Sequence, residues 1–223
     1  MRLQKKRIER AQLLLKELKK LFPKDKHEIS ELTHWSNPWE LLVAVVLSAQ
    51  CTDKRVNMVT KDLFKKYITL DDYCAVSHEE FAQDIHSTGF YNSKTKNILA
   101  AAQMVRDEYD GKVPDIMSAL IRIPGVARKT ANVVLGNAFG KVEGMAVDTH
   151  VKRFAIRFDL TDEKNPEKIE RDLMELLPRK DWFIGSNLMI QYGRHIAPAR
   201  KYDTSKDPLV DIYPKAGERF RVN

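Results

Sequence analysis

The sequence predicts an all-α fold. Apolar residues recur with the helical period along most of the 223 residues, while the alternation expected of half-buried strands is nearly absent. Helix start signals are frequent, and the clearest break without a helical pattern in the second half is Gly140-Lys-Val-Glu-Gly144. These observations favour an all-α protein and place a candidate domain junction near this break.

The N-terminal segment, from Arg2 to Lys20, alternates charged residues with leucines. This pattern predicts an amphipathic helix that packs on its own domain, and it does not match a secretory signal. The next signal is stronger, because Asn37 can cap a helix, Pro38 suits its first turn and Glu40 stands at the capping-box position. The apolar run that continues through Ala49 is well short of the ~20 residues that span a bilayer, so we expect a buried core helix.

Further helix signals follow in order. Ser77 begins a second capping box with Glu80. Apolar residues at helical spacing predict helices over residues 53–66, 93–110, 116–123, 127–139, 148–158, 165–176 and 181–195. Near the C-terminus, Pro198, Pro208, Pro214 and scattered charges predict an irregular loop followed by a loose end.

The composition favours a polyanionic partner. The formal net charge is +7, and short basic clusters recur near the ends of the predicted helices. Such clusters suit phosphate contacts along a groove, although cationic proteins without this role are common. The two cysteines, Cys51 and Cys74, have no paired spacing, so we expect neither a disulfide framework nor a cysteine metal site, and we expect a reducing cytoplasm.

The segment from Ile121 to Val134 contains the most informative lysine of the chain. Pro124-Gly125 signals a turn between a short helix and a second helix, which places Lys129 in the first turn of the second. A helix N-terminus carries partial positive charge and unpaired amides, so Arg128 and Lys129 are unfavourable there unless an anion such as phosphate binds. The alternative is a solvated lysine beside an ordinary helix-helix turn.

Downstream, Asp148 precedes Thr149-His150-Val151. An aspartate in this position is a good helix N-cap, which is one interpretation. A lysine at one helix start and an aspartate at the next also predict a nucleophile with a carboxylate partner. If the break near Gly140 is a domain junction, Lys129 and Asp148 lie on opposite walls of one cleft.

Five motifs occur in order along the chain: Leu47-Ser-Ala-Gln-Cys-Thr-Asp53, Gly89-Phe-Tyr-Asn-Ser-Lys94, Ile123-Pro-Gly-Val-Ala-Arg-Lys-Thr-Ala-Asn-Val-Val134, Ala146-Val-Asp-Thr-His150 and Gly193-Arg194. Together they resemble the endonuclease III family of DNA glycosylases, in the helix-hairpin-helix superfamily. The resemblance covers nearly the whole chain and is far more specific than the hairpin alone. It implies two helical domains with a DNA-binding cleft between them. One is a six-helix barrel with the helix-hairpin-helix over residues 31–141, and the other combines residues 1–30 and 142–223.

The resemblance implies a bifunctional DNA glycosylase and AP lyase that removes oxidised pyrimidines from duplex DNA in base excision repair. Lys129 then corresponds to the nucleophile that attacks C1′ of the damaged nucleotide and forms a Schiff base, which leads to strand cleavage by β-elimination. Asp148 corresponds to the carboxylate that assists deprotonation and stabilises positive charge on the sugar. An amine suits this step because it can form an imine, which a hydroxyl cannot do.

Before this chemistry the target base must leave the base stack, and side chains must fill the gap. By the resemblance, Gln50 fills the gap and Phe90 acts as a wedge; from the residues alone, a polar helix end and a core aromatic are the alternatives. Gly125 and Ala127 are expected to hold a phosphate through backbone amides, although the family more often has glycine in place of Ala127. The other DNA contacts that the resemblance implies are Asn92, Lys94, Arg128, Thr130, His150, Arg194, Arg200 and Lys201.

The family pattern fails near the C-terminus. Most relatives bind an iron-sulfur cluster through four cysteines after the Gly-Arg motif, whereas this chain has Ala197, Thr204, Asp207 and Tyr213 at those positions. None is a thiolate, so we expect no cluster and no bound metal. We expect apolar packing against the last helix and surface ion pairs to hold the loop instead. The residues expected to pack are Pro208, Leu209, Ile212, Tyr213 and Pro214, and those expected to pair are Asp203, Asp207 or Asp211.

Two alternatives remain open. A bifunctional glycosylase with another base preference, such as 8-oxoguanine or mismatched thymine, would share these motifs, and a helix-hairpin-helix DNA-binding module without catalysis would share the basic residues. Such a module has no use for a carboxylate facing phosphates, so the presence of Lys129 with Asp148 favours the enzyme. We expect a monomer in the cytoplasm, associated with the nucleoid, that binds damaged double-stranded DNA and no membrane.

Overall fold

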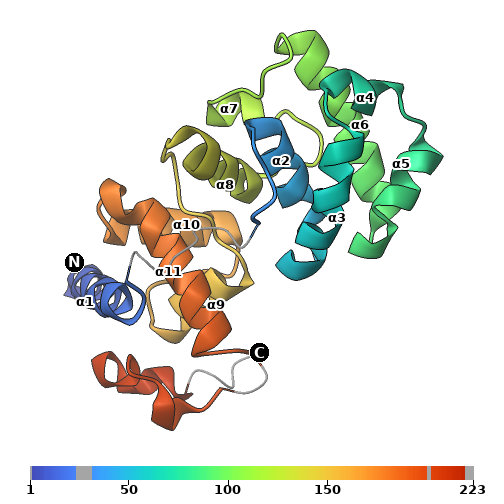
Figure 1. Ribbon diagram of the computed structural model, residues 1–223. Helices are drawn as coiled ribbons and strands as arrows, with labels where there is room; N and C mark the ends of the chain where they lie inside the picture. Colours follow the sequence, from blue (N-terminus) through green and yellow to red (C-terminus); the bar gives the residue numbers. More distant parts are fainter. Residues whose placement is uncertain (1, 24–31, 200–201, 219–223) are drawn as a thin grey trace. The chain divides into compact units, whose positions relative to one another are not determined.

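The computed structural model describes residues 2–23, 32–199 and 202–218. Within these ranges every regular element is a helix, which confirms the predicted all-α fold (Figure 1). No helix in this part of the chain is long and apolar enough to cross a membrane. The α-helices are α1 (Arg2–Leu21), α2 (Pro38–Leu47), α3 (Asp53–Lys66), α4 (Leu70–Ala75), α5 (His78–Asp84), α6 (Tyr91–Glu108), α7 (Met117–Leu120), α8 (Arg128–Phe139), α9 (Thr149–Arg157), α10 (Pro166–Leu176) and α11 (Trp182–His195). The 3-10 helices are η2 (His86–Thr88), η3 (Arg179–Asp181), η4 (Thr204–Lys206), η5 (Val210–Ile212) and η6 (Pro214–Ala216).

The chain divides into two compact units. The middle unit is Ser30–Glu143, and the terminal unit combines Met1–Ile29 with Gly144–Asn223. Each unit has a hydrophobic core of its own, as expected of parts that can fold independently. Lys129 therefore belongs to the middle unit and Asp148 to the terminal unit.

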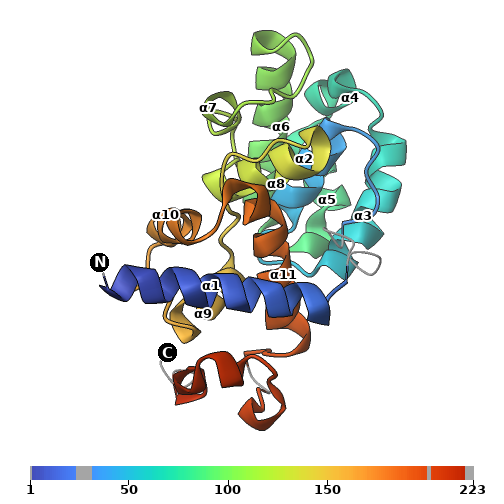
Figure 2. The ribbon, with the colours of Figure 1, turned by 90° about the vertical axis from the view of Figure 1, so that its left-hand side faces the viewer.

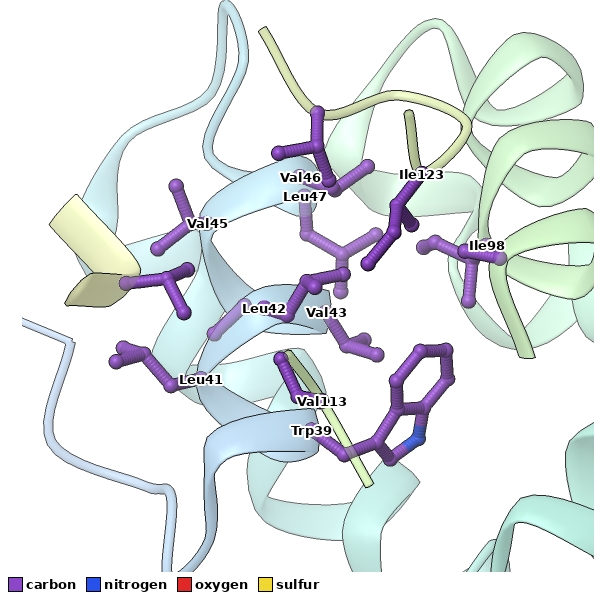
Figure 3. Packing of buried hydrophobic residues seen from close by; sticks show 14 of the residues in the cluster. Trp39, Leu41, Leu42, Val43, Val45, Val46, Leu47, Ile98, Val113 and Ile123 are labelled. Atoms are coloured by element: carbon purple, nitrogen blue, oxygen red, sulfur yellow. The ribbon is translucent and has the colours of Figure 1, made fainter. Parts of the chain in front are cut away.

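The core of the middle unit is organised around α2. Asn37 begins this helix by accepting a hydrogen bond from the Glu40 amide at 3.0 Å, and Pro38 occupies its first turn, as predicted. Every residue from Leu41 to Leu47 is buried, and Figure 3 shows these side chains packed among the neighbouring elements. The helix ends two residues before the predicted Ala49, a difference typical of helix boundaries.

Helices α3, α6 and α8 pack against α2 and cover this core (Figure 1). Helix α4, for which the sequence analysis made no prediction, also packs against α6. It begins with a capping box in which Thr69 and Asp72 bond each other's backbone amides. An aromatic cluster with ring centroids 5.2–5.8 Å apart is formed by Trp39, Tyr67, Tyr73 and Phe81.

The terminal unit joins the N-terminal helix to the second half of the chain. The leucines Leu14, Leu15 and Leu18 of α1 are buried, and α1 contacts α10 and α11 (Figure 2). On the charged face, Arg10 donates hydrogen bonds to the carbonyl of Asp159 at 2.7 Å and to its carboxylate at 3.0 Å. The amphipathic helix thus packs on its own unit through both faces, as predicted.

Where the sequence analysis predicted an irregular loop, the described part of the C-terminal segment forms three short 3-10 helices; the end predicted to be loose, residues 219–223, lies outside the described residues. Leu209 is fully buried in the core of the terminal unit, and Ile212 and Tyr213 pack against it. The packing predicted for Pro208 and Pro214 is wrong, because both prolines are exposed. Apolar residues this widely spaced form no period, and the sequence analysis therefore missed the short helices.

Candidate functional site

The hairpin between α7 and α8 depends on Gly125. Its φ of 80° lies in the left-handed region, which glycine adopts readily. A Cβ at this position would lie 2.9 Å from the Cβ of Asn97 on α6, so no larger residue fits. The amide of Val126 donates to the carbonyl of Ile123 at 3.0 Å and closes the turn. The packing of the hairpin on α6 therefore requires glycine at this position, whether or not a phosphate binds to its backbone. The sequence did not reveal that Asn97 is the residue that excludes a larger side chain.

The first turn of α8 presents backbone amides without a side-chain cap. Ala127 is the N-cap residue, and its methyl group offers no hydrogen-bond acceptor. Its φ of −83° is one that alanine adopts without strain. In this turn Lys129 is exposed, and Arg128 and Thr130 are half-buried. Uncapped amides together with cations at one helix end are an arrangement that a phosphate group neutralises.

Gln50 and Phe90 share an unusual backbone conformation. Their φ angles are 53° and 50°, in the left-handed region that residues other than glycine seldom adopt. Both residues are exposed, and 64% of the Phe90 surface is accessible, which excludes a core aromatic at this position. Residues in such conformations cluster at functional sites, where the surrounding structure must hold them.

A cavity of about 260 Å³ in the middle unit brings several of these residues together. Its walls come from the end of α2, the residue before α6, the first turns of α6, the hairpin and α8. Asn92 is exposed in the first turn of α6, while Ala127, Arg128 and Lys129 do not line the cavity. The predicted site residues in its walls are Gln50, Phe90, Lys94, Gly125 and Thr130.

Lys94 does not present its ammonium group to solvent. The residue is buried, and Nζ donates hydrogen bonds to the carbonyls of Leu47 at 2.8 Å and of Thr88 at 2.9 Å. Burial lowers the pKa of this amine, and the charge of the nearby Cys51 acts in the opposite direction. The DNA contact predicted for Lys94 is therefore wrong, because its cation is used inside the middle unit.

In the terminal unit, Asp148 is the N-cap residue of α9. Its Oδ1 accepts hydrogen bonds from the amides of His150 and Val151, both at 2.8 Å. The capping interpretation of Asp148 is therefore correct. Because both bonds end on Oδ1, the second oxygen, Oδ2, remains able to accept another hydrogen bond or a proton. Capping and a catalytic role can coexist in one carboxylate.

His150 packs on Gly193 of α11. A Cβ at Gly193 would lie 2.5 Å from Nδ1 of His150, so only glycine fits beneath the imidazole. The same Nδ1 lies 3.1 Å from Nη2 of Arg153, and burial lowers the pKa of the ring. The glycine of the Gly-Arg motif therefore allows α9 to pack closely on α11. The arginine of the motif, Arg194, is partly exposed in the last turn of α11.

The four positions at which the resemblance implies cysteines are occupied by an aliphatic, a hydroxyl, a carboxylate and a phenol side chain. Ala197 and Asp207 are buried, Tyr213 is half-buried and Thr204 is exposed. In the described part of the chain, no three His, Cys, Asp or Glu residues form a group that could hold a metal ion. An iron-sulfur cluster needs thiolate ligands, so these residues do not fit one. Two basic residues predicted for the same region lie outside the described residues: Arg200 and Lys201.

Asp207 organises this segment instead. Its Oδ2 accepts hydrogen bonds from the hydroxyls of Tyr192 and Tyr202, and its Oδ1 accepts one from the Leu209 amide at 2.9 Å. The guanidinium of Arg157 lies 4.0 Å from the centre of the Tyr202 ring. Burial, with the bond to Asp207, raises the pKa of Tyr202 to about 12. Of the aspartates expected to form surface ion pairs, Asp207 is buried, whereas Asp203 forms one with Lys206 at 3.4 Å.

Comparison with known proteins places these motifs in a family context. Residues 43–179 match the HhH-GPD superfamily of base excision DNA repair proteins. The chain is 45% identical over 208 residues to an endonuclease III of Synechocystis sp., with 93% of each chain covered. It is 42% identical over 213 residues to an endonuclease III of Bacillus subtilis, with 95% of each covered.

Solved structures show the same similarity. A non-covalent endonuclease III–DNA complex matches with a TM-score of 0.89 and 43% identity, over 96% of this chain and 98% of that one. A trapped covalent endonuclease III–DNA intermediate matches with the same TM-score and identity, over 96% and 99%. A thermostable thymine-DNA glycosylase, at 21% identity and a TM-score of 0.81, shares the fold.

Proposed function

Because the chain belongs to the endonuclease III family, within the HhH-GPD superfamily of base excision DNA repair proteins, we propose that Lys129 and Asp148 are the residues with which it excises oxidised pyrimidines from duplex DNA. The chain is a DNA glycosylase and AP lyase, and DNA is its partner. The observation that carries the proposal is the exposed amine of Lys129, in the first turn of a helix whose amides have no side-chain cap.

Lys129 supplies the nucleophile. Its amine, as the free base, attacks C1′ of the damaged nucleotide and forms the N–C1′ bond, while the glycosidic C–N bond breaks and its electron pair leaves with the base, which takes up a proton. The C1′-bound nitrogen then loses one proton, and its lone pair expels O4′, which takes up a proton as the sugar ring opens; the product is a protonated imine. Removal of a proton from C2′ finally expels the 3′ phosphate and cleaves the strand by β-elimination.

Asp148 supplies the carboxylate. Its Oδ1 is fixed by two backbone amides of α9, which leaves Oδ2 to accept a proton from the attacking amine or to face the positive charge on the sugar. A carboxylate held in this way needs little reorganisation when that charge develops.

The DNA contacts follow from the same assignment. The exposed side chains of Gln50 and Phe90 enter the duplex where the damaged base leaves the stack. The hairpin amides at Gly125 and Ala127 hold a phosphate. The other residues proposed to contact the backbone are Asn92, Arg128, Thr130, His150, Arg194, Arg200 and Lys201.

We further propose that the protein works without an iron-sulfur cluster, as a monomer on damaged duplex DNA in the cytoplasm, associated with the nucleoid. The buried centre around Asp207 supports the first point, because one carboxylate there joins the hydroxyls of Tyr192 and Tyr202 and the Leu209 amide without a metal. A purified protein without the visible absorbance of such a cluster, yet fully active, is the expected result.

The direct test uses a duplex that carries one thymine glycol, with and without borohydride. We expect a nick without borohydride and a covalent protein–DNA adduct with it, because borohydride reduces the imine. Lys129→Ala is expected to abolish both products and to keep its affinity for a non-cleavable abasic analogue. Lys112→Ala, which removes another exposed lysine of the middle unit, is the matched control and keeps both products.

Each other outcome has a defined meaning. Nicking by Lys129→Ala shows that another amine is the nucleophile. Binding without either product contradicts the proposed substrate, and a duplex with an abasic site in the same assay then separates another base preference, which still gives an adduct, from a non-catalytic module, which does not.

A further inference from the structure

Lys94 is a buried cation that the chemistry of excision does not use. It lies in the first turn of α6 with 4% of its surface exposed, and its ammonium donates to two backbone carbonyls, of Leu47 and Thr88. Lysine is seldom buried so fully unless its charge has partners. The two carbonyls are those partners, and their positions in the chain indicate the role.

The first carbonyl belongs to the end of α2. Leu47 is the last residue of this helix, and the carbonyls of a last turn have no intrahelical donor. If the helix continued, the amide of Cys51 would donate to the Leu47 carbonyl. That amide donates instead to the Ser48 carbonyl at 3.1 Å. The Lys94 ammonium takes the place of that amide, at the helix end where a cation is favoured.

The second carbonyl belongs to the last residue of η2, two residues before Phe90. The first stands three residues before Gln50. One ammonium group therefore joins two segments that are far apart in the sequence, each just ahead of a residue in the left-handed region. Such a conformation persists at residues other than glycine only where the surroundings hold it.

We propose that Lys94 is a positioning residue that holds Gln50 and Phe90 in place, so that both side chains are ready to enter the duplex when the damaged base leaves the stack. This inference rests on the gap-filling role proposed above for those two residues. A preformed pair of side chains lowers the cost of extrusion, since no loop has to be ordered at that moment.

The test compares two duplexes that carry the same thymine glycol. In one the lesion lies opposite adenine, and in the other it lies opposite an abasic analogue, where it is easily unstacked. With Lys94→Met, which keeps the length of the side chain but donates no hydrogen bond, we expect single-turnover excision to fall about 10-fold or more on the paired duplex and less than about threefold on the other.

Lys96→Met removes an exposed lysine of the same helix and is expected to leave both rates unchanged. A second test combines Lys94→Met with Phe90→Ala. If Lys94 acts through Phe90, its substitution adds little once the phenyl ring is gone. If Lys94→Met does not fold, Lys94→Gln replaces it, because glutamine is shorter but keeps a hydrogen-bond donor. The measured quantity is again the ratio of the excision rates on the two duplexes.

An equal loss on both duplexes overturns the inference, because a smaller folded fraction or a damaged active centre slows both reactions alike. Independent effects of Lys94→Met and Phe90→Ala also overturn it. Absence of excision by the wild-type protein on both duplexes contradicts the proposed function instead, so the two failures are distinguishable.

Discussion

Burial separates the roles of two lysines in the middle unit. Lys129 is exposed at the start of α8, where its amine can meet a substrate, whereas the ammonium of Lys94 is enclosed and bonded to two carbonyls. Both appear as basic residues near helix starts in the sequence, so charge alone does not tell them apart. In the mechanism proposed here, attack on the sugar and support of the inserting residues fall to different lysines of one unit.

The burial of Lys94 has a measurable pH dependence. Because burial lowers its pKa in the folded state, the unfolded chain binds more protons once the pH exceeds that value. The free energy of unfolding of the wild type, relative to that of Lys94→Met, is therefore expected to rise with pH toward the ordinary lysine value of 10.5. Urea unfolding of both proteins from pH 7 to pH 10 measures the difference; a constant or falling difference would show that the amine is not buried in solution.

Gly125 offers a second test at this scale. Gly125→Ala is expected to lower the free energy of unfolding by about 2–3 kcal/mol, because it adds a strained φ and a contact of 2.9 Å with the Cβ of Asn97. Gly140→Ala is the matched control, since its φ is 63° but nothing lies within 4 Å of the added Cβ. It should cost about 1 kcal/mol, the strain of an L-residue in the left-handed region. Equal losses in urea unfolding would show that the contact with Asn97 is relieved without cost.

At the scale of elements, the C-terminal segment depends on a buried carboxylate. Asp207→Ala removes the acceptor for two tyrosine hydroxyls and one amide, and is expected to lower the free energy of unfolding by about 2–3 kcal/mol. Asp211→Ala, at an exposed position of the same segment, should change it by less than about 0.5 kcal/mol. Urea unfolding measures the loss, and amide hydrogen exchange should show faster exchange over residues 202–218 in Asp207→Ala only.

The elements also show what sequence patterns can reveal. Strong local signals, such as the Asn37 cap and the long apolar periods, predicted most helices to within one or two residues. The Asp148 cap was foreseen as an alternative for the same reason. The burial of Lys94 and the centre around Asp207 were missed, because both arise from residues that only the tertiary structure brings together. For Lys94, membership in a family motif predicted a contact with DNA, whereas its burial shows that the ammonium bonds to carbonyls inside the middle unit.

For the whole molecule, the net charge of +7 predicts salt-dependent binding. The logarithm of the affinity for an undamaged duplex should fall linearly with the logarithm of the salt concentration, with a slope of about −0.9 for each phosphate contact. Arg128→Ala is expected to reduce the magnitude of the slope by about 1, whereas Lys112→Ala leaves it unchanged. Fluorescence anisotropy between 50 and 300 mM salt, roughly the range over which such contacts weaken, measures both slopes. Identical slopes for Arg128→Ala and wild type would exclude a phosphate contact by the Arg128 side chain.

Because the terminal unit combines both ends of the chain, the two units can complete their folding at different times during synthesis. The middle unit is continuous, so it can fold on the ribosome as soon as residue 143 has emerged, before the rest of the terminal unit has emerged. Helix α1 is made first, but its leucines become buried only when α10 and α11, which are made near the end of synthesis, can pack against it. During translation the apolar face of α1 therefore lacks the helices that cover it until α10 and α11 have been made.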